Sequence, residues 1–264
     1  MFLKAVFPGK YIQGEGVLDQ LPHLVNCFGK KGLIVASRSA RDKILVPYAD
    51  DLKASAIIVE AFHGECCEKE LSRVAQIISH EQVDVLVGMG GGKAIDTAKI
   101  AADRAGIPVI IVPTIASTDA PCSGCAVLYT EDGAFDSVYD QKTNPQVALV
   151  DTTVIANAPV RFLISGMGDA LATWFEARSC DRTRSLNACG GHGTPAGLHL
   201  ARLCYDTLMA FGAAAEIAAE KHLVTPASKD LNGLCSLTYR AAGRSYQTLR
   251  RRDKMFLVEN TDKI

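Results

Sequence analysis

Residues 1–150 alternate short runs of Val, Ile and Leu with amphipathic segments, and this alternation restricts the fold more than any other feature. Helical spacing of apolar residues is found at 68–79 and 94–105. The apolar runs between these segments are 32–36, 56–59, 83–87, 109–112 and 147–150. Nearly continuous apolar runs joined by helices are typical of parallel strands that are buried on both faces. We therefore predict an α/β domain with a parallel sheet for residues 1–160.

The pattern changes after Asp151, where long helical segments replace the alternation. We predict helices at 161–179, 196–211 and 213–222, with glycine-rich breaks at 190–193 and around Gly212. This predicts an all-helical second domain, incomplete in length, over 161–227. A third segment, 228–264, holds eight Lys or Arg and four Asp or Glu, whereas residues 1–227 hold 20 and 25.

Composition excludes several classes of function. The formal net charge of −1 argues against a nucleic-acid-binding protein. The most apolar window, 105–116, contains two Pro and one Gly and is too short to span a membrane, and the first residues do not form a signal peptide. The nine Cys are an odd number, and the pair Cys122 and Cys125 has no second pair at zinc-ribbon spacing. We expect reduced, mostly buried cysteines in a cytoplasmic protein.

A glycine-rich turn follows the predicted strand at 83–87 and precedes a predicted helix. Its residues are Gly90, Gly91, Gly92 and Lys93. Backbone amides at the start of a helix, together with a lysine, suit a pyrophosphate group. The turn matches neither the GxGxxG pattern nor the Walker A pattern, and a plain glycine-rich turn is the alternative. We favour anion binding.

Two further segments carry polar groups. The loop 113–123 follows the strand at 109–112, and its four hydroxyls and one carboxylate could contact a ribose and a hydroxylated substrate. A capped polar loop is the alternative. In 166–176, Asp169, Thr173 and Glu176 fall on one helical face. Asp169 is a candidate metal ligand, with the N-terminal cap of a helix as the alternative.

Together these segments resemble the glycerol dehydrogenases of the iron-containing alcohol dehydrogenase superfamily, continuously from about residue 8 to 226. The matching motifs are 8–14, 90–93, 96–99, 113–123, 168–178 and 224–226. The resemblance implies an NAD-binding α/β domain, a dehydroquinate synthase-like helical domain and a zinc ion between them. It further implies oxidation of glycerol to dihydroxyacetone by a homo-oligomer.

The resemblance also implies roles for individual residues. Gly91, Gly92 and Lys93 would hold the cofactor pyrophosphate. Asp119 would face the glycerol hydroxyls, and Asp169 would be the first zinc ligand. The remaining cofactor contacts would be Thr114 and Ser117 on the adenosine side, and Ser123, Cys125 and Tyr129 on the nicotinamide side.

The sequence departs from the family pattern in two places. Ser37 and Arg38 stand where the family usually has an aspartate for the adenosine ribose, which leaves the choice between NAD and NADP open. The family's two zinc-binding histidines lie beyond Pro226, whereas no His follows His222 here. With one carboxylate in place of three ligands, zinc affinity should fall sharply.

Other interpretations stand beside the one that the resemblance implies. Dehydroquinate synthases and glycerol-1-phosphate dehydrogenases share the implied architecture, but their phosphorylated substrates require basic residues that the matching motifs lack. The chain could instead be a catalytically inactive or truncated nucleotide-binding homologue that lacks the two zinc histidines. For 228–264, which does not resemble the family, we hypothesise an altered reading frame or a mis-spliced end.

Overall fold

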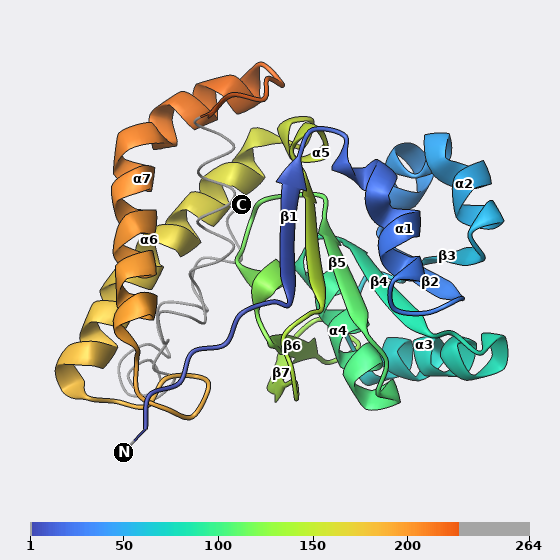
Figure 1. Cartoon of the computed structure of the whole chain (residues 1–264), viewed down its shortest axis with the longest axis horizontal. Helices are drawn as coiled ribbons and strands as arrows, with labels where there is room; N and C mark the ends of the chain where they lie inside the picture. The colour runs from blue at the N-terminus through green and yellow to red at the C-terminus, as the bar shows by residue number, and fades with distance from the viewer. Residues whose placement is uncertain (1, 227–264) are drawn as a thin grey trace.

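The computed structural model describes residues 2–226, and its central element is a six-stranded parallel sheet (Figure 1). The strand order is β1-β8-β5-β4-β2-β3. Every residue of β2, β4, β5 and β8 is buried, as a parallel sheet covered on both faces requires. The strands are β1 (Lys10–Gly14), β2 (Gly32–Ala36), β3 (Ile57–Ala61), β4 (Val85–Gly90), β5 (Val109–Pro113) and β8 (Val147–Asp151).

The five strands predicted from sequence are all present, and two of them begin later than expected. β4 starts at Val85, because the side chain of Asp84 binds the segment that precedes β2. The Asp84 carboxylate accepts hydrogen bonds from the backbone amides of Lys30 and Lys31 at 2.8 and 3.1 Å, just before β2. β3 starts at Ile57 because Ala56 adopts a turn conformation with φ of 53°.

Three strands were not predicted. β1 extends the sheet beyond β8, pairing Lys10 with Val147. The other two, β6 (Cys125–Tyr129) and β7 (Phe135–Asp140), form an antiparallel hairpin outside the main sheet. The hairpin turn includes Gly133 with φ of 86°, a conformation that favours glycine.

Helices cover both faces of the sheet and enclose two apolar cores. One core lies beneath α1 (Leu21–Asn26) and α2 (Ala49–Ala54) and includes Ile34. The other lies beneath α3 (Glu68–Glu81) and α4 (Gly92–Ala105) and includes Leu33. Ile34 and Leu33 are neighbours in β2 that point to opposite faces. Short helical turns are η1 (Val17–Gln20), η2 (Ala40–Ile44), η3 (Val46–Tyr48) and η4 (Ala120–Cys122).

The chain after β8 is helical, as predicted. It contains α5 (Thr152–Ala156), α6 (Val160–Thr183) and α7 (Pro195–Glu220). α6 and α7 run antiparallel beside the sheet, since Leu163 packs near Ala215 and Ala177 packs near Ala201 (Figure 1). None of the helices between residues 2 and 226 has the length and apolar character of a membrane span. The charged segment 228–264 lies outside the described residues.

One predicted helix break is wrong. α7 continues through Gly212 without interruption from Pro195 to Glu220. A Cβ at Gly212 would lie 3.3 Å from Leu208 Cδ1 and 3.9 Å from Met167 Sδ. The nearer of these atoms belongs to α7 itself, and 3.9 Å is an ordinary van der Waals distance, so Gly212 is an interior residue of α7 that lies beside α6. The break at 190–193 is confirmed, and Gly190 has φ of 79° there.

Candidate functional site

The carboxyl ends of β2 and β4 form the point at which the chain changes direction across the sheet. β2 leads to β3 on one side, and β4 leads to β5 on the other. Open α/β sheets bind ligands in the crevice at such a point. The Ser37 amide donates to the Met89 carbonyl at 2.8 Å, and the Thr114 amide donates to the Gly90 carbonyl at 3.0 Å. The turns that follow β2, β4 and β5 therefore meet at one edge.

The glycine-rich turn is shaped by its neighbours. A Cβ at Gly91 would lie 2.9 Å from Ile115 Cδ1, and a Cβ at Gly90 would lie 2.9 Å from Ala94 Cβ. α4 begins at Gly92, and no side chain caps it. The first amides of a helix lack partners within that helix, so this turn presents N–H groups suited to an anion.

Lys93 extends the same turn toward the hairpin. Its Nζ lies 2.6 Å from Glu65 Oε2 and 4.7 Å from the centre of the Tyr129 ring. Burial, together with the Asp96 carboxylate, raises the pKa of Tyr129, so its phenol stays neutral near pH 7. The structure thus brings Lys93 and Tyr129 together, with Glu65 as the acid that neutralises the lysine.

A buried ion pair underlies this edge, and the sequence analysis missed it. Lys99 is fully buried, and its Nζ donates at 3.0 Å to Asp96 Oδ1, to the Ala120 carbonyl and to Ser123 Oγ. Asp96 Oδ2 accepts from the Val127 amide at 2.9 Å. The network ties α4 to the loop and to β6. The pairing of Asp96 and Lys99 three residues apart in a helix of small residues could have indicated it.

The other predicted cofactor residues lie along the same path. Ser123 is buried, and its hydroxyl donates to the Cys125 carbonyl at 3.1 Å. Thr114 and Cys125 are buried, whereas Ser117 is half-buried in the loop. Burial raises the pKa of the neighbouring Cys122 thiol to about 12, so the thiol is protonated near pH 7. Six of the eight cysteines between residues 2 and 226 are buried, as expected.

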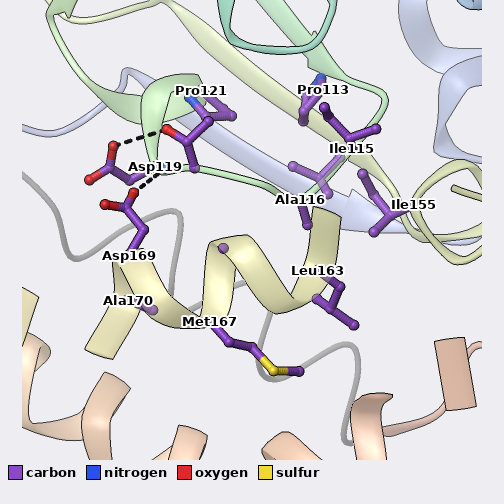
Figure 2. A pocket seen from close by; sticks show the side chains of 13 residues that line it. Pro113, Ile115, Ala116, Asp119, Pro121, Ile155, Leu163, Met167, Asp169 and Ala170 are labelled. Carbon is purple, nitrogen blue, oxygen red and sulfur yellow. Dashed lines mark hydrogen bonds between the residues drawn. The ribbon is translucent and has the colours of Figure 1, made fainter. Parts of the chain in front are cut away.

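Asp119 and Asp169 come together at one end of a cavity between the loop and α6 (Figure 2). The Asp119 amide donates to Asp169 Oδ2 at 3.2 Å, and the Thr118 hydroxyl lies 3.4 Å from Asp119 Oδ1. Ile155 and Leu163 line the apolar part of the cavity. The cavity volume is about 30 Å³, enough for one or two water molecules. Access to the two carboxylates therefore depends on the spacing between the loop and α6.

The alternative interpretation of Asp169 as a helix cap is wrong. α6 begins at Val160, which places Asp169 well inside the helix. Thr173, expected on the same face, donates its hydroxyl to the Asp169 carbonyl at 3.1 Å. Only the Asp169 carboxylate of this pair reaches the loop, because the Thr173 hydroxyl is bonded to its own helix.

The helix approaches the loop closely at Gly166. A Cβ at this position would lie 2.2 Å from the Ala116 carbonyl oxygen. Such a distance is shorter than any stable contact, so a glycine is required where α6 crosses the loop. This crossing places Asp169, three residues further along the helix, beside Asp119.

Within residues 2–226, no third metal-binding side chain joins these carboxylates. Among residues 2–226, no group of three or more His, Cys, Asp and Glu could hold a metal ion. His199 is exposed on α7, and His222 Nδ1 lies 3.0 Å from the Ala156 carbonyl. The part of the chain that the structure describes therefore does not form a complete metal site.

Comparisons with known proteins identify relatives of this chain. The family model for iron-containing alcohol dehydrogenase matches residues 8–152. A glycerol dehydrogenase of Escherichia coli O6:H1 is 45% identical over 227 residues, covering 83% of this chain and 60% of the relative. One from Thermotoga maritima is 43% identical over 228 residues, covering 86% and 62%.

A solved structure also matches. The crystal structure of a probable glycerol dehydrogenase from Sinorhizobium meliloti 1021 has a TM-score of 0.85 and 40% identity to this chain. The match covers 92% of this chain and 68% of that structure. The chain spans about three fifths of the length of the curated relatives described above.

Proposed function

Because the chain belongs to the iron-containing alcohol dehydrogenase family, we propose that it oxidises glycerol to dihydroxyacetone with a nicotinamide dinucleotide as hydride acceptor. The observation that carries this proposal is that the Gly90–Lys93 turn and the Asp119–Asp169 cavity lie on either side of one loop, 113–123. Relatives named glycerol dehydrogenase support glycerol as the substrate. We also propose that residues 1–160 and 161–227 are separate domains of a cytoplasmic homo-oligomer.

The residues of the turn fit the pyrophosphate of such a cofactor. Gly91 lets Ile115 pack against the turn, Gly92 adds no side chain at the start of α4, and Lys93 supplies a positive charge. Thr114 and Ser117 would contact the adenosine side. On the nicotinamide side the contacts would be Ser123, Cys125 and Tyr129. The bound nicotinamide would accept a hydride from the carbon that carries the reacting hydroxyl.

The two carboxylates would bind and orient the polyol. Alcohol oxidation removes a hydride from carbon and a proton from oxygen, so the hydroxyl needs a hydrogen-bond acceptor. Asp119 and Asp169 supply carboxylate oxygens at one end of the cavity. The cavity of about 30 Å³ would have to widen between the loop and α6 to admit the polyol.

The described residues do not fit a closed zinc site. Structural zinc sites have four ligands and catalytic sites three protein ligands, whereas Asp119 and Asp169 are the only two carboxylates in the set that lines this cavity. Asp169 remains the candidate ligand proposed from the sequence. The roles assigned here to Asp119 and the glycine turn do not depend on a metal.

Asp169→Asn should lower kcat/KM for glycerol by about 10–100-fold, because a hydrogen bond to a charged acceptor contributes about 1.5–3 kcal/mol. The assay is glycerol-dependent reduction of NAD and of NADP by the full chain, with and without added zinc. Asp206→Asn is the control, since Asp206 pairs with Arg202 on the exposed face of α7. Cofactor binding without turnover in any condition would instead identify an inactive nucleotide-binding homologue.

Lys93→Met should weaken ADP-ribose binding by about tenfold, because a charge-assisted contact to phosphate is lost. The loss in binding free energy is limited, because Lys93 must leave its ion pair with Glu65 to contact the phosphate. Isothermal titration calorimetry measures this directly. Lys31→Met is the matched control, since Lys31 pairs with Glu81 at 2.7 Å before β2 begins. Equal dissociation constants for Lys93→Met and the unmodified chain would remove Lys93 from the site.

A further inference from the structure

We propose that Ser37 and Arg38 form a pocket for the 2′-phosphate of NADP, so that this chain prefers NADP over NAD. This proposal rests on the proposed function, because it assumes that a dinucleotide binds at the Gly90–Lys93 turn. It adds a cofactor preference and assigns it to two residues at the end of β2.

The position of Ser37 is the first argument. Ala36, the last residue of β2, is level with Met89 of β4, and the Ser37 amide donates to the Met89 carbonyl at 2.8 Å. A Cβ at Gly90 would lie 2.9 Å from Ser37 Cβ. Ser37 is therefore in contact with the turn that would hold the pyrophosphate. The ribose is covalently next to the pyrophosphate, so its hydroxyls fall within reach of this strand end.

The residue type at this strand end decides which ribose is bound. A carboxylate there accepts a hydrogen bond from the 2′-hydroxyl of NAD, whereas an arginine accommodates the 2′-phosphate of NADP. This chain has no acidic residue between 37 and 41. A phosphate monoester carries about −1.5 to −2 charges near pH 7 and would be repelled by a carboxylate at Ser37. A serine hydroxyl can instead donate a hydrogen bond to it.

Arg38 is placed to meet such an anion. Its side chain is 92% exposed, and its Nε lies 3.7 Å from Asp42 Oδ2, beyond hydrogen-bond distance. Asp42 is held by Arg41 through a 2.7 Å contact between Nε and Oδ1, and this contact lowers the pKa of Asp42. Asp42 thus has its shorter contact with Arg41 and a longer ion pair with Arg38, and a phosphate with up to two negative charges would compete with Asp42 for Arg38.

The remaining charged and polar groups nearby agree with an anion site. Ser39 Oγ lies 3.4 Å from Ser37 Oγ, so a second hydroxyl is adjacent. Glu60 on the neighbouring strand β3 is engaged by Arg73 at 3.3 Å. Residues 37–43 carry three basic side chains and one acidic one. The local charge is thus positive at the end of β2, in a chain whose formal net charge is −1.

The test compares 2′,5′-ADP with 5′-AMP, which differ only in the 2′-phosphate. Calorimetry on the full chain at physiological salt should give at least tenfold tighter binding of 2′,5′-ADP than of 5′-AMP. The isomer 3′,5′-ADP carries the same charge and should bind no more tightly than 5′-AMP. These probes require no glycerol, metal or turnover, so the result is independent of catalysis.

Substitutions test which residues cause the tighter binding of 2′,5′-ADP. Arg38→Ala should weaken 2′,5′-ADP binding about tenfold and leave 5′-AMP binding unchanged. Lys53→Ala is the control, since Lys53 is exposed on α2 outside residues 37–43, and it should change neither constant more than about twofold. Ser37→Asp should reverse the preference, favouring NADH over NADPH in a binding titration.

Each contrary outcome has a distinct meaning. Equal binding of 2′,5′-ADP and 5′-AMP would overturn the NADP preference and leave the proposed function intact. Tighter 2′,5′-ADP binding that survives Arg38→Ala would overturn the assignment to Arg38. Absence of binding by every nucleotide, including NADH and NADPH, would overturn this inference together with the proposed function.

Discussion

Replacing Asp96 with alanine is expected to lower the free energy of unfolding by about 3–5 kcal/mol. The reason is that Lys99 is fully buried and Asp96 is its carboxylate partner, at 3.0 Å. Removing one member of a buried ion pair leaves the other as an uncompensated charge in a region of low dielectric. The Val127 amide would also lose its acceptor. Urea denaturation of the full chain, followed by circular dichroism, measures the loss.

Two companion variants separate this effect from a general loss of ion pairing. Asp206→Ala removes the partner of Arg202 on the surface and should cost at most about 1 kcal/mol. The double variant Asp96→Ala with Lys99→Met removes both charges and should recover part of the stability lost in Asp96→Ala. A single Asp96 variant as mild as the Asp206 variant would contradict the burial of Lys99 as a charged group.

Gly166→Ala is expected to destabilise the chain by about 1–3 kcal/mol, near the upper end of that range. The added methyl would meet the Ala116 carbonyl oxygen at 2.2 Å. The methyl would be fixed to the backbone of α6 and the oxygen belongs to the backbone of the loop, so neither can move alone. Thermal unfolding measures the change in stability. The substitution should also separate Asp169 from Asp119, and it should therefore lower any glycerol turnover.

The same helix supplies the control. Gly168 lies two residues further along α6, and a Cβ there would meet nothing within 4 Å. Gly168→Ala should therefore stabilise the chain by about 0.5–1 kcal/mol, because alanine is the better helix former. Opposite signs for the two glycines would support the close crossing of α6 over the loop. Equal effects would contradict it.

These predictions concern contacts that hold the loop 113–123 on two of its sides. From one side, Lys99 donates to the Ala120 carbonyl and the Ser123 hydroxyl. From the other side, Asp169 accepts from the Asp119 amide. The loop that would lie between cofactor and polyol is thus fastened to α4 and to α6. Its geometry depends in part on Lys99, to which no ligand contact is assigned.

Much of the α/β part could be predicted from the sequence because its signals are local. A buried parallel strand must be apolar along its whole length, so each run of Val and Ile marks a strand directly. The glycine turn at Gly90–Lys93 is also predicted from residues that are adjacent in the sequence. Family membership follows from motifs of the same local kind, and the family match confirms it. The site roles assigned by resemblance remain predictions.

Several features could not be predicted because they depend on partners distant in sequence. From sequence, Gly212 is expected to interrupt a helix, but α7 continues through it beside α6. Asp169 resembles a helix cap until the true start of α6 at Val160 is known. A lysine in a helix is usually expected to face solvent, whereas Lys99 is buried beneath the loop at Ala120 and Ser123.

By itself, the sequence determined the parallel sheet, the helical second part, the glycine turn and the family, since each depends on residue type and spacing along the chain. The tertiary structure alone decided that Lys99 is buried, that α7 is continuous, and that Asp119 and Asp169 share one cavity. The two residues, joined by a hydrogen bond from the Asp119 amide to the Asp169 carboxylate, are 50 residues apart in the sequence. Their contact arises from the packing of α6 against the loop, and no periodicity in the chain records such packing.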